Sequence, residues 1–394
     1  MPSPLCCACR FGRPTSVQKL LELGVDTNKS DPIGMKPLEI AAKHGHKKCL
    51  EVLLNHGAGP ETPSGIGKGT SMHHVVANGD VQICQLLLEH GADSNNPLLK
   101  SPLLHGVVTR RLPHTTKQRI DLLTFLVKYN VNINDTDEQK ATPLLVATEN
   151  GFGDLARCLL EYDPDVNLPD IDGRTPIFEA VRNQDEGLVK LLLEKGADVN
   201  VRTTEGLFPL HFASSSTPIA KMIAEKNKDV NVKSNNGLTE LMFLASKGWE
   251  DPVKVLLENK ADTEIEVDRT ASNWAGYTAI SFAAFCNHPG TVTLLASYGA
   301  DLNHKDASGL NPLHLAIDGT DESGGSCLQA LMEFRTKISI DQVDNAGETA
   351  LGLAAFKDVL RPIQLLVRGG ANINSQDNEG RTALAKTIDG TIVS

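Results

Sequence analysis

Residues 173–200 read GRTPIFEAVRNQDEGLVKLLLEKGADVN, and this stretch decides the fold. Thr175 and Pro176 suit the start of a helix, because a threonine hydroxyl can accept hydrogen bonds from free N–H groups and proline is tolerated in the first turn. A second segment, LVKLLLEKG, is apolar on one face, and Gly196 supplies the left-handed residue that ends it. The stretch therefore predicts two short helices that pack against each other.

The same pattern recurs along the whole chain. Residues 347–374 read GETALGLAAFKDVLRPIQLLVRGGANIN, and a shorter match, GLNPLHLAIDG, begins at residue 309. Successive turn positions lie 31–41 residues apart, most often 33, which is a period typical of repeat proteins. Because no unit can bury its apolar face alone, the units must stack, and residues 1–394 are predicted to form a single all-α solenoid. We expect units beginning near residues 1, 34, 68, 99, 140, 173, 206, 237, 276, 309, 347 and 380, the last one partial.

This pattern resembles the ankyrin repeat, whose signature is Thr-Pro-Leu-His-x-Ala-Ala. The fullest matches are PLHFA at 209–213 and NPLHLA at 311–316, and the resemblance extends from Ser3 to about Ile388. It implies stacked helix-turn-helix units with short β-hairpin-like turns and a concave face that binds another protein. It also implies that first-helix histidines such as His211 and His314 hydrogen-bond to the neighbouring turn.

Composition and charge narrow the function classes. Apolar residues make up 40% of the chain and charged residues 22%, which suits a folded, soluble protein, while aromatics are only 4%, so the core should be mostly Leu, Val, Ile and Ala. The net charge of −11, without a basic stripe, argues against nucleic acid as a partner. No apolar run approaches the roughly 18 residues of a membrane span, and no secretory signal is evident. We expect a monomer in the cytoplasm or nucleus that does not insert into membranes.

The eight cysteines are predicted to be reduced and buried. Cys49, Cys84 and Cys158 lie in apolar helical runs, and Cys7 and Cys9 align with apolar positions of the first helix of another unit. No Cys or His partners follow at the spacing of a zinc site.

A search for chemistry finds little. The segment GIGKGT at 65–70 resembles a phosphate-binding loop, but Gly69 follows Lys68 where Ser or Thr is needed, and Thr62 stands where a glycine is needed. No nucleophile–base pair is brought together by the repeat pattern. We therefore expect no enzyme activity, no catalytic residues, no metal site and no cofactor.

Three units and the C-terminal unit depart from the pattern. Residues 109–116 and 319–326 lengthen connections between paired helices, and residues 266–274 lengthen a turn. Such insertions often carry function. For the two helix connections, tolerated surface variation is an equally good explanation. The last unit stops after one helix, with Lys386 at a normally apolar position. That helix is either a polar cap or part of a longer protein.

Apolar residues at the turn tips mark a predicted partner-binding edge, because tips are normally polar. Trp274 and Tyr277 flank Gly276 beside the long turn, and Trp and Tyr are favoured interface anchors. If they bind, replacing both with Ala should leave the thermal midpoint nearly unchanged; alternatively, the long turn folds back and Trp274 packs into a local core. The predicted edge consists of Leu207, Phe208, Leu238, Trp274, Tyr277, Phe285 and Leu310.

The sequence thus favours a scaffold or adaptor that binds a protein or peptide. A second interpretation is the ankyrin targeting portion of a larger receptor, channel, enzyme or effector. A third is an unusual enzyme or small-molecule binder that uses the concave groove.

Overall fold

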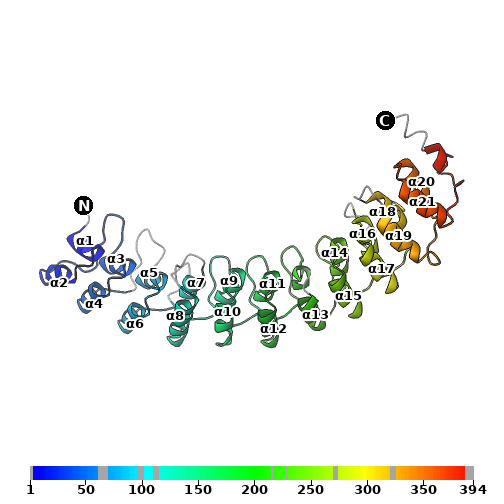
Figure 1. The fold of residues 1–394 in the computed structure, drawn as a ribbon. Helices are drawn as coiled ribbons and strands as arrows, with labels where there is room; N and C mark the ends of the chain where they lie inside the picture. The colour runs from blue at the N-terminus through cyan, green and yellow to red at the C-terminus, as the bar shows by residue number, and fades with distance from the viewer. Residues whose placement is uncertain are drawn as a thin grey trace. The chain divides into compact units, whose positions relative to one another are not determined.

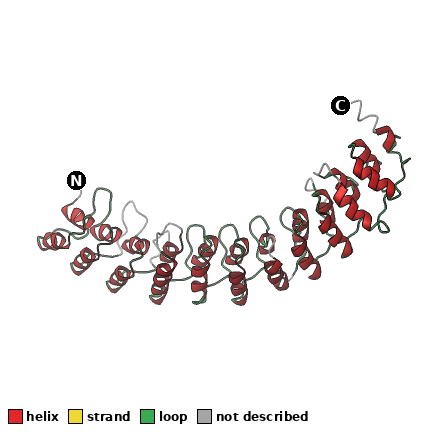
Figure 2. Cartoon of the chain, viewed as in Figure 1, coloured by secondary structure: helices red, strands yellow, loops and turns green. Residues whose placement is uncertain are grey.

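The computed structural model describes residues 3–60, 70–95, 102–109, 115–213, 217–227, 229–268, 274–319 and 325–386. In these residues helices alternate with loops, and β structure is limited to isolated bridges across three turns (Figure 2). None of the described helices has both the length and the apolar composition needed to cross a bilayer. Contacts divide the chain into two units, residues 1–198 and 199–394, which are taken separately.

Unit 1 is built from paired helices (Figure 1). The first helices pack on one another in chain order, and several neighbouring second helices also contact each other. The pairs are α1 (Pro4–Arg10) and α2 (Pro14–Glu22), α3 (Pro37–Lys43) and α4 (Lys47–Asn55), α5 (Ser71–Asn78) and α6 (Val81–Glu89), α7 (Leu103–Val108) and α8 (Thr116–Lys128), α9 (Pro143–Glu149) and α10 (Gly153–Leu160), and α11 (Pro176–Arg182) and α12 (Glu186–Glu194).

Unit 2 repeats this arrangement, with a 3-10 helix in place of its first α-helix. Its first helices again pack in sequence, as do its second helices. The pairs are η1 (Pro209–Phe212) and α13 (Thr217–Lys226), α14 (Glu240–Lys247) and α15 (Glu250–Glu258), α16 (Ala279–Phe285) and α17 (Pro289–Ser297), α18 (Pro312–Asp318) and α19 (Gly325–Glu333), and α20 (Ala350–Phe356) and α21 (Leu360–Arg368), followed by a helical turn at 383–386.

The all-α fold predicted from the repeat pattern is confirmed. Each first helix after α1 begins three or four residues after its predicted turn position. The core is dominated by Leu, Val, Ile and Ala, and small residues such as Ala41, Ala42 and Ala283 are completely buried where first helices meet. Each helix pair therefore obtains its core from its neighbours.

Most of the described tip turns share one hydrogen-bond pattern. Asp170 Oδ1 accepts hydrogen bonds from the backbone N–H groups of Asp172 and Arg174, both at 2.9 Å. Gly173 lies between them at φ +79°, a left-handed conformation that costs other residues energy. The same two bonds form at Asp31, Asp137, Asp306, Asp344 and Asp377.

The first-helix histidines divide into two groups. His314 Nε2 donates a hydrogen bond to the carbonyl of Glu348 in the next turn at 3.0 Å, as expected. For His211 the expectation is wrong: its Nδ1 accepts the N–H of Phe208 at 3.1 Å, and its buried Nε2 has no hydrogen-bond partner among the described residues. Glu240 stands where other repeats have Pro, Ala or Ser, and its buried carboxylate lies 3.0 Å from Nδ1.

The first helix corrects one cysteine prediction. Cys6 and Cys9 face the core, at 1% and 0% exposure, while Cys7 is half-buried. Burial raises the pKa of the Cys9 thiol, so the neutral form that packs as a hydrophobe is favoured. Residues three apart share a helix face, which explains the pairing of Cys6 with Cys9.

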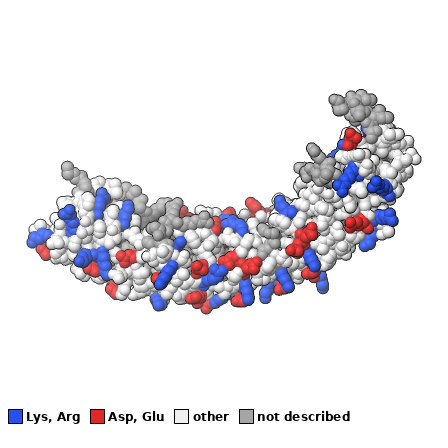
Figure 3. All heavy atoms as spheres, viewed as in Figure 1, with Lys and Arg blue, Asp and Glu red and all other residues white. Residues whose placement is uncertain are grey.

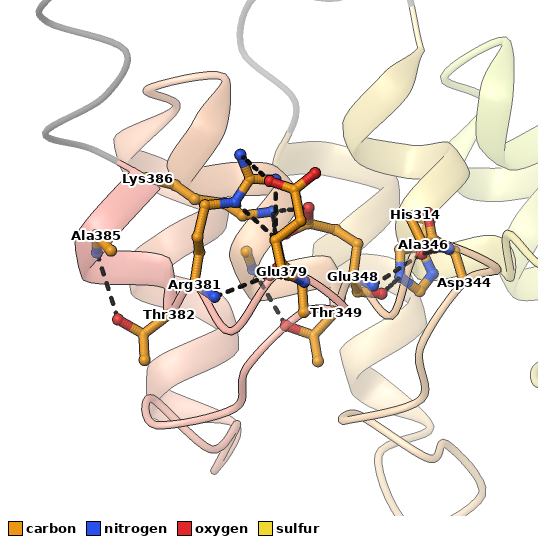
Figure 4. A network of polar contacts seen from close by, with 12 residues as sticks. His314, Asp344, Ala346, Glu348, Thr349, Glu379, Arg381, Thr382, Ala385 and Lys386 are labelled. Atoms are coloured by element: carbon orange, nitrogen blue, oxygen red, sulfur yellow. Dashed lines mark hydrogen bonds and ion pairs between the residues drawn. The ribbon is translucent and has the colours of Figure 1, made fainter.

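The polar cap expected at Lys386 also needs correction. The Lys386 side chain is 4% exposed, and its ammonium group contacts the carboxylates of Glu348 and Asp377, the latter at 2.8 Å (Figure 4). Arg381 contacts the same Asp377 oxygen, Oδ2, at 3.0 Å. The hydrogen bond from Lys386, followed by those from Arg381, holds the pKa of Asp377 well below its usual range. The lysine charge is thus buried and paired within the stack.

The structure describes part of the two repeats with long helix connections. α7 ends at Val108 and α8 begins at Thr116, while α18 ends at Asp318 and α19 begins at Gly325, so both long connections lie between paired helices as predicted. Their residues 110–114 and 320–324, and most of the GIGKGT segment, lie outside the described residues.

Acid should weaken the fold through His314. Burial lowers the pKa of its imidazole below the ordinary value near 6.5, so the unfolded chain binds a proton more readily than the folded protein. The stability that depends on neutral His314 is present above about pH 6.5 and is lost as the pH falls below it. In His314→Gln, whose amide can still donate to the Glu348 carbonyl, the loss of unfolding free energy between pH 7.5 and 5.5 should be smaller than in the wild type.

Urea unfolding followed by circular dichroism at the two pH values measures this difference. His90→Gln, a change at an exposed histidine, is the matched control and should keep the wild-type pH dependence. Equal pH dependence in all three proteins would contradict the assignment.

Candidate functional site

The long turn of unit 2 is an ordinary tip turn with residues inserted into it. At Asp306, the backbone N–H bonds to the Leu310 carbonyl, four residues on. In the long turn the N–H of Val267 bonds to the Tyr277 carbonyl at 2.9 Å, ten residues on, and the N–H of Gly276 bonds back to the Val267 carbonyl at 2.9 Å. The base of the turn is therefore retained. Residues 269–273 of the insertion lie outside the described residues.

Four rings gather where this turn meets α16. The Trp274 ring centroid lies 5.3 Å from Tyr277, 5.6 Å from Phe282 and 5.3 Å from Phe285. Tyr277 in turn lies 5.2 Å from Phe282 and 6.2 Å from Phe285. Most of these pairs are edge-on or tilted, which is the favoured geometry for aromatic contacts. We call these four residues the aromatic cluster.

The members of the aromatic cluster differ in exposure. Trp274 is 37% exposed, Phe285 is half-buried, and Tyr277 and Phe282 are each 6% exposed. The Tyr277 ring belongs to the core, so we now expect its removal to lower stability. For Trp274 the sequence allowed either a binding anchor or a local core. The structure has features of both, because one side of the ring packs on the other rings and part of it faces solvent.

Acidic groups surround the polar end of Tyr277. Burial raises the pKa of its hydroxyl, and the nearby carboxylates of Asp306 and Asp318 raise it further. Asp306 is buried, while Asp318 is exposed and pairs with Lys357 at 2.5 Å. The aromatic cluster is thus bordered by negative charge.

The other predicted contact residues lie in separate turns. Leu207, Leu238 and Leu310 directly follow the turn glycines of their repeats and are half-buried. Phe208 is 4% exposed and packs between His211, whose ring centroid is 5.9 Å away, and the guanidinium of Arg202. The structure therefore joins Trp274, Tyr277 and Phe285 in one cluster and leaves Phe208 in the core.

Sequence reasoning missed Phe243, and it included Phe282 only within the segment 281–286 that continues the predicted edge. Both occupy the residue after the signature histidine position, as Phe212 does, so three consecutive repeats carry Phe at one register position. Phe243 contacts His211 at 5.9 Å and Trp249 at 6.3 Å between centroids. Comparing equal positions across repeats, rather than turn tips alone, would have found this aromatic run.

A second apolar surface lies at the last repeat. A groove of about 330 Å³ runs between α20, α21 and the helical turn at 383–386. Val367, Ile373 and Leu384 on its lining are 46%, 56% and 73% exposed. The lining includes no His, Asp or Glu, so it offers no acid or base for catalysis. It also contains none of the residues that the sequence singled out.

Charge is mixed over the visible surface. On the face shown in Figure 3, Lys and Arg side chains intermingle with Asp and Glu instead of gathering in a patch. An interface there would rest on apolar contacts, with charge in a secondary role.

The comparisons with known proteins agree with this architecture. A family model described as ankyrin repeats (3 copies) matches residues 5–97, 114–203 and 210–306. Human "Ankyrin repeat and SOCS box protein 6" is 31% identical over 152 residues, covering 37% of this chain and 34% of that protein. A Caenorhabditis elegans homologue of "Transient receptor potential cation channel subfamily A member 1" is 27% identical over 147 residues, covering 37% of this chain and 12% of the channel.

A solved structure, the human ASB11 ankyrin repeat domain, is 25% identical and covers 58% of this chain and 99% of that one, with a TM-score of 0.48. The present chain spans about a third, or less, of the length of the two relatives described above. Because the family model matches most of the sequence and the helix pairs follow its repeat, the chain belongs to the ankyrin-repeat family.

Proposed function

We propose that this chain binds a protein or peptide partner through the aromatic cluster, with the Trp274 ring as the anchor. The observation that carries the proposal is the partial exposure of Trp274 on a support of three packed rings. An exposed aromatic that is already held in place loses little conformational freedom on binding, so more of the contact energy remains as affinity.

The surroundings favour a partner with apolar and basic side chains. An apolar side chain would cover the exposed part of Trp274, and a basic side chain would complement the negative field of Asp306 and Asp318 at Tyr277, which Lys357 offsets in part at Asp318. The net charge of −11 supports the same choice. Leu310, in the next tip, and Phe285 extend this edge, since both are half-buried.

Two models describe how the cell would use this chain. In one, the chain acts as an adaptor in the cytoplasm or nucleus that holds partner proteins. In the other, it is the targeting portion of a longer protein, and the relatives include both a SOCS box protein and a cation channel by name. Both models use the same contact at the aromatic cluster.

Within the cluster, the two tip aromatics should differ in their effect on stability. Tyr277→Ala removes a buried ring and should lower the free energy of unfolding by about 3–4 kcal/mol. Trp274→Ala removes a ring that is already partly in water and should cost about 1–2 kcal/mol. Urea unfolding of the two variants measures both values, and an equal loss would contradict the difference in burial.

Partner capture should depend on Trp274. The immobilised wild-type chain and Trp274→Ala are exposed to extract from the native cell, and retained proteins are quantified by mass spectrometry. Proteins held by the cluster should fall at least about tenfold with the variant, as for a binding hot spot. Tyr298→Ala, which removes an exposed aromatic outside the aromatic cluster, is the control and should retain them.

Titration of each purified partner against the same three proteins then gives the affinities. Unchanged binding to Trp274→Ala, measured on a variant that remains folded, would overturn the proposal.

A further inference from the structure

Neighbouring repeats are linked by a row of side-chain hydrogen bonds near the ends of their second helices. In each link a side-chain oxygen accepts a bond from the backbone N–H of the next repeat, as Asn167 does from Asp198 at 2.8 Å and Asn231 from Asp262 at 2.8 Å. Asparagine is the usual residue in this row; the other asparagines recorded in it are Asn95, Asn134 and Asn303. The link needs one oxygen and no charge.

Glu264 departs from this pattern beside the long turn. Its Oε1 accepts the bond from the N–H of Asp301 at 3.0 Å, so it performs the task of the asparagine. Its second oxygen receives no hydrogen bond recorded within the described chain. A carboxylate at this position places a negative charge directly beside the side chain of Asp301. Repulsion between the two like charges disfavours this arrangement.

A histidine completes the group. Glu264, Asp301 and His304 each offer a ligand atom, and these atoms lie within 4.8 Å of one another. Glu264 and Asp301 are exposed and His304 is half-buried, so the group is open to solvent on one side. Asp301 Oδ1 accepts the N–H of Asn303 at 2.9 Å, which fixes the carboxylate and leaves its other oxygen for a ligand.

The orientation of His304 suits metal binding. Its Nε2 lies 2.9 Å from the carbonyl of Gly276, and a carbonyl can only accept, so Nε2 carries the proton. The carboxylate of Glu266 lies 3.4 Å from the same nitrogen. In the neutral ring Nδ1 then has a free lone pair. Histidines that bind metals commonly donate their other N–H to a carbonyl or carboxylate in this way.

We propose that Glu264, Asp301 and His304 form a zinc-binding site between two repeats, with water completing the coordination. One imidazole and two carboxylates are ligands that Zn²⁺ accepts, and three protein ligands plus water form an open tetrahedral site. Ligand atoms in such a site lie about 3.3 Å apart, so zinc binding requires the two exposed acids to rotate inward from a spacing of up to 4.8 Å. This site departs from the expectation, drawn from sequence spacing, that the chain holds no metal.

Zinc here would act on the long turn. His304 holds the carbonyl of Gly276, and Glu264 lies three residues before Val267 at the base of the same turn. A metal that joins the two would therefore brace the segment that carries Trp274. The proposal does not depend on partner binding, because the ligand residues are outside the aromatic cluster.

The test is isothermal titration of ZnCl₂ into the full chain after removal of bound metal by a chelator. Glu264→Asn is the decisive variant, because Asn can keep the hydrogen bond to Asp301 as its counterparts do, while the second carboxylate oxygen is lost. His304→Gln is the second variant. Wild type should bind zinc with one-to-one stoichiometry, and each variant should bind at least about tenfold more weakly.

Asp341→Asn is the matched control. Asp341 accepts the N–H of Asn372 at 2.8 Å in the same row, so the variant makes the corresponding acid-to-amide change elsewhere and should leave zinc affinity unchanged. Zinc should also raise the thermal midpoint of the wild type and of Asp341→Asn but not of Glu264→Asn.

Three results would overturn the proposal. The first is no zinc binding by the wild type. The second is zinc binding that survives in Glu264→Asn, with a thiolate-to-metal band when Co²⁺ replaces Zn²⁺, which would place the metal on cysteines. The third is Ca²⁺ binding as tight as that of zinc and unaffected by His304→Gln, because calcium prefers oxygen ligands alone.

Discussion

A single carboxylate oxygen that accepts two backbone N–H groups organises six of the tip turns that the structure describes. Asp170 shows the arrangement: its bonds to residues 172 and 174 close the turn around Gly173 and set the direction in which α11 begins. Turns of equal shape then meet edge to edge, as where the N–H of Ile171 bonds to the carbonyl of Gln139 at 3.0 Å. The helices are short and would be marginal alone, so their packing depends on this shared register.

Much of the fold was predictable because the same sequence pattern recurs along the chain. Positions of the first helices follow from the turn residues, and the resemblance supplied the role of His314. The surroundings of residues that depart from the repeat pattern were harder to predict, because they depend on which side chains of other turns lie next to them. Lys386 was expected to be a surface cap, yet two acids from other turns surround its charge. His211 makes no recorded bond to the next turn, and the buried acid Glu240 lies beside its ring.

The candidate site was predicted in part for a related reason. The tips pointed to Trp274, Tyr277 and Phe285, which the structure brings together, but burial of Phe208 and Tyr277 depends on neighbouring side chains that a tip pattern does not register. Phe243 was missed although its register position carried a signal. The Glu264, Asp301 and His304 group was invisible to motif searches, because its ligands come from two repeats and become neighbours only through stacking.

The long turn has a wider consequence. Val267, Gly276 and Tyr277 keep the closing bonds of an ordinary tip. The insertion of six residues therefore leaves the base of the turn unchanged. The backbone of Val267 and Tyr277 holds the base of the loop, while the proposed contact with a partner rests on the Trp274 side chain. A lineage, or a protein engineer, can exchange what the loop presents while the scaffold that carries it stays the same.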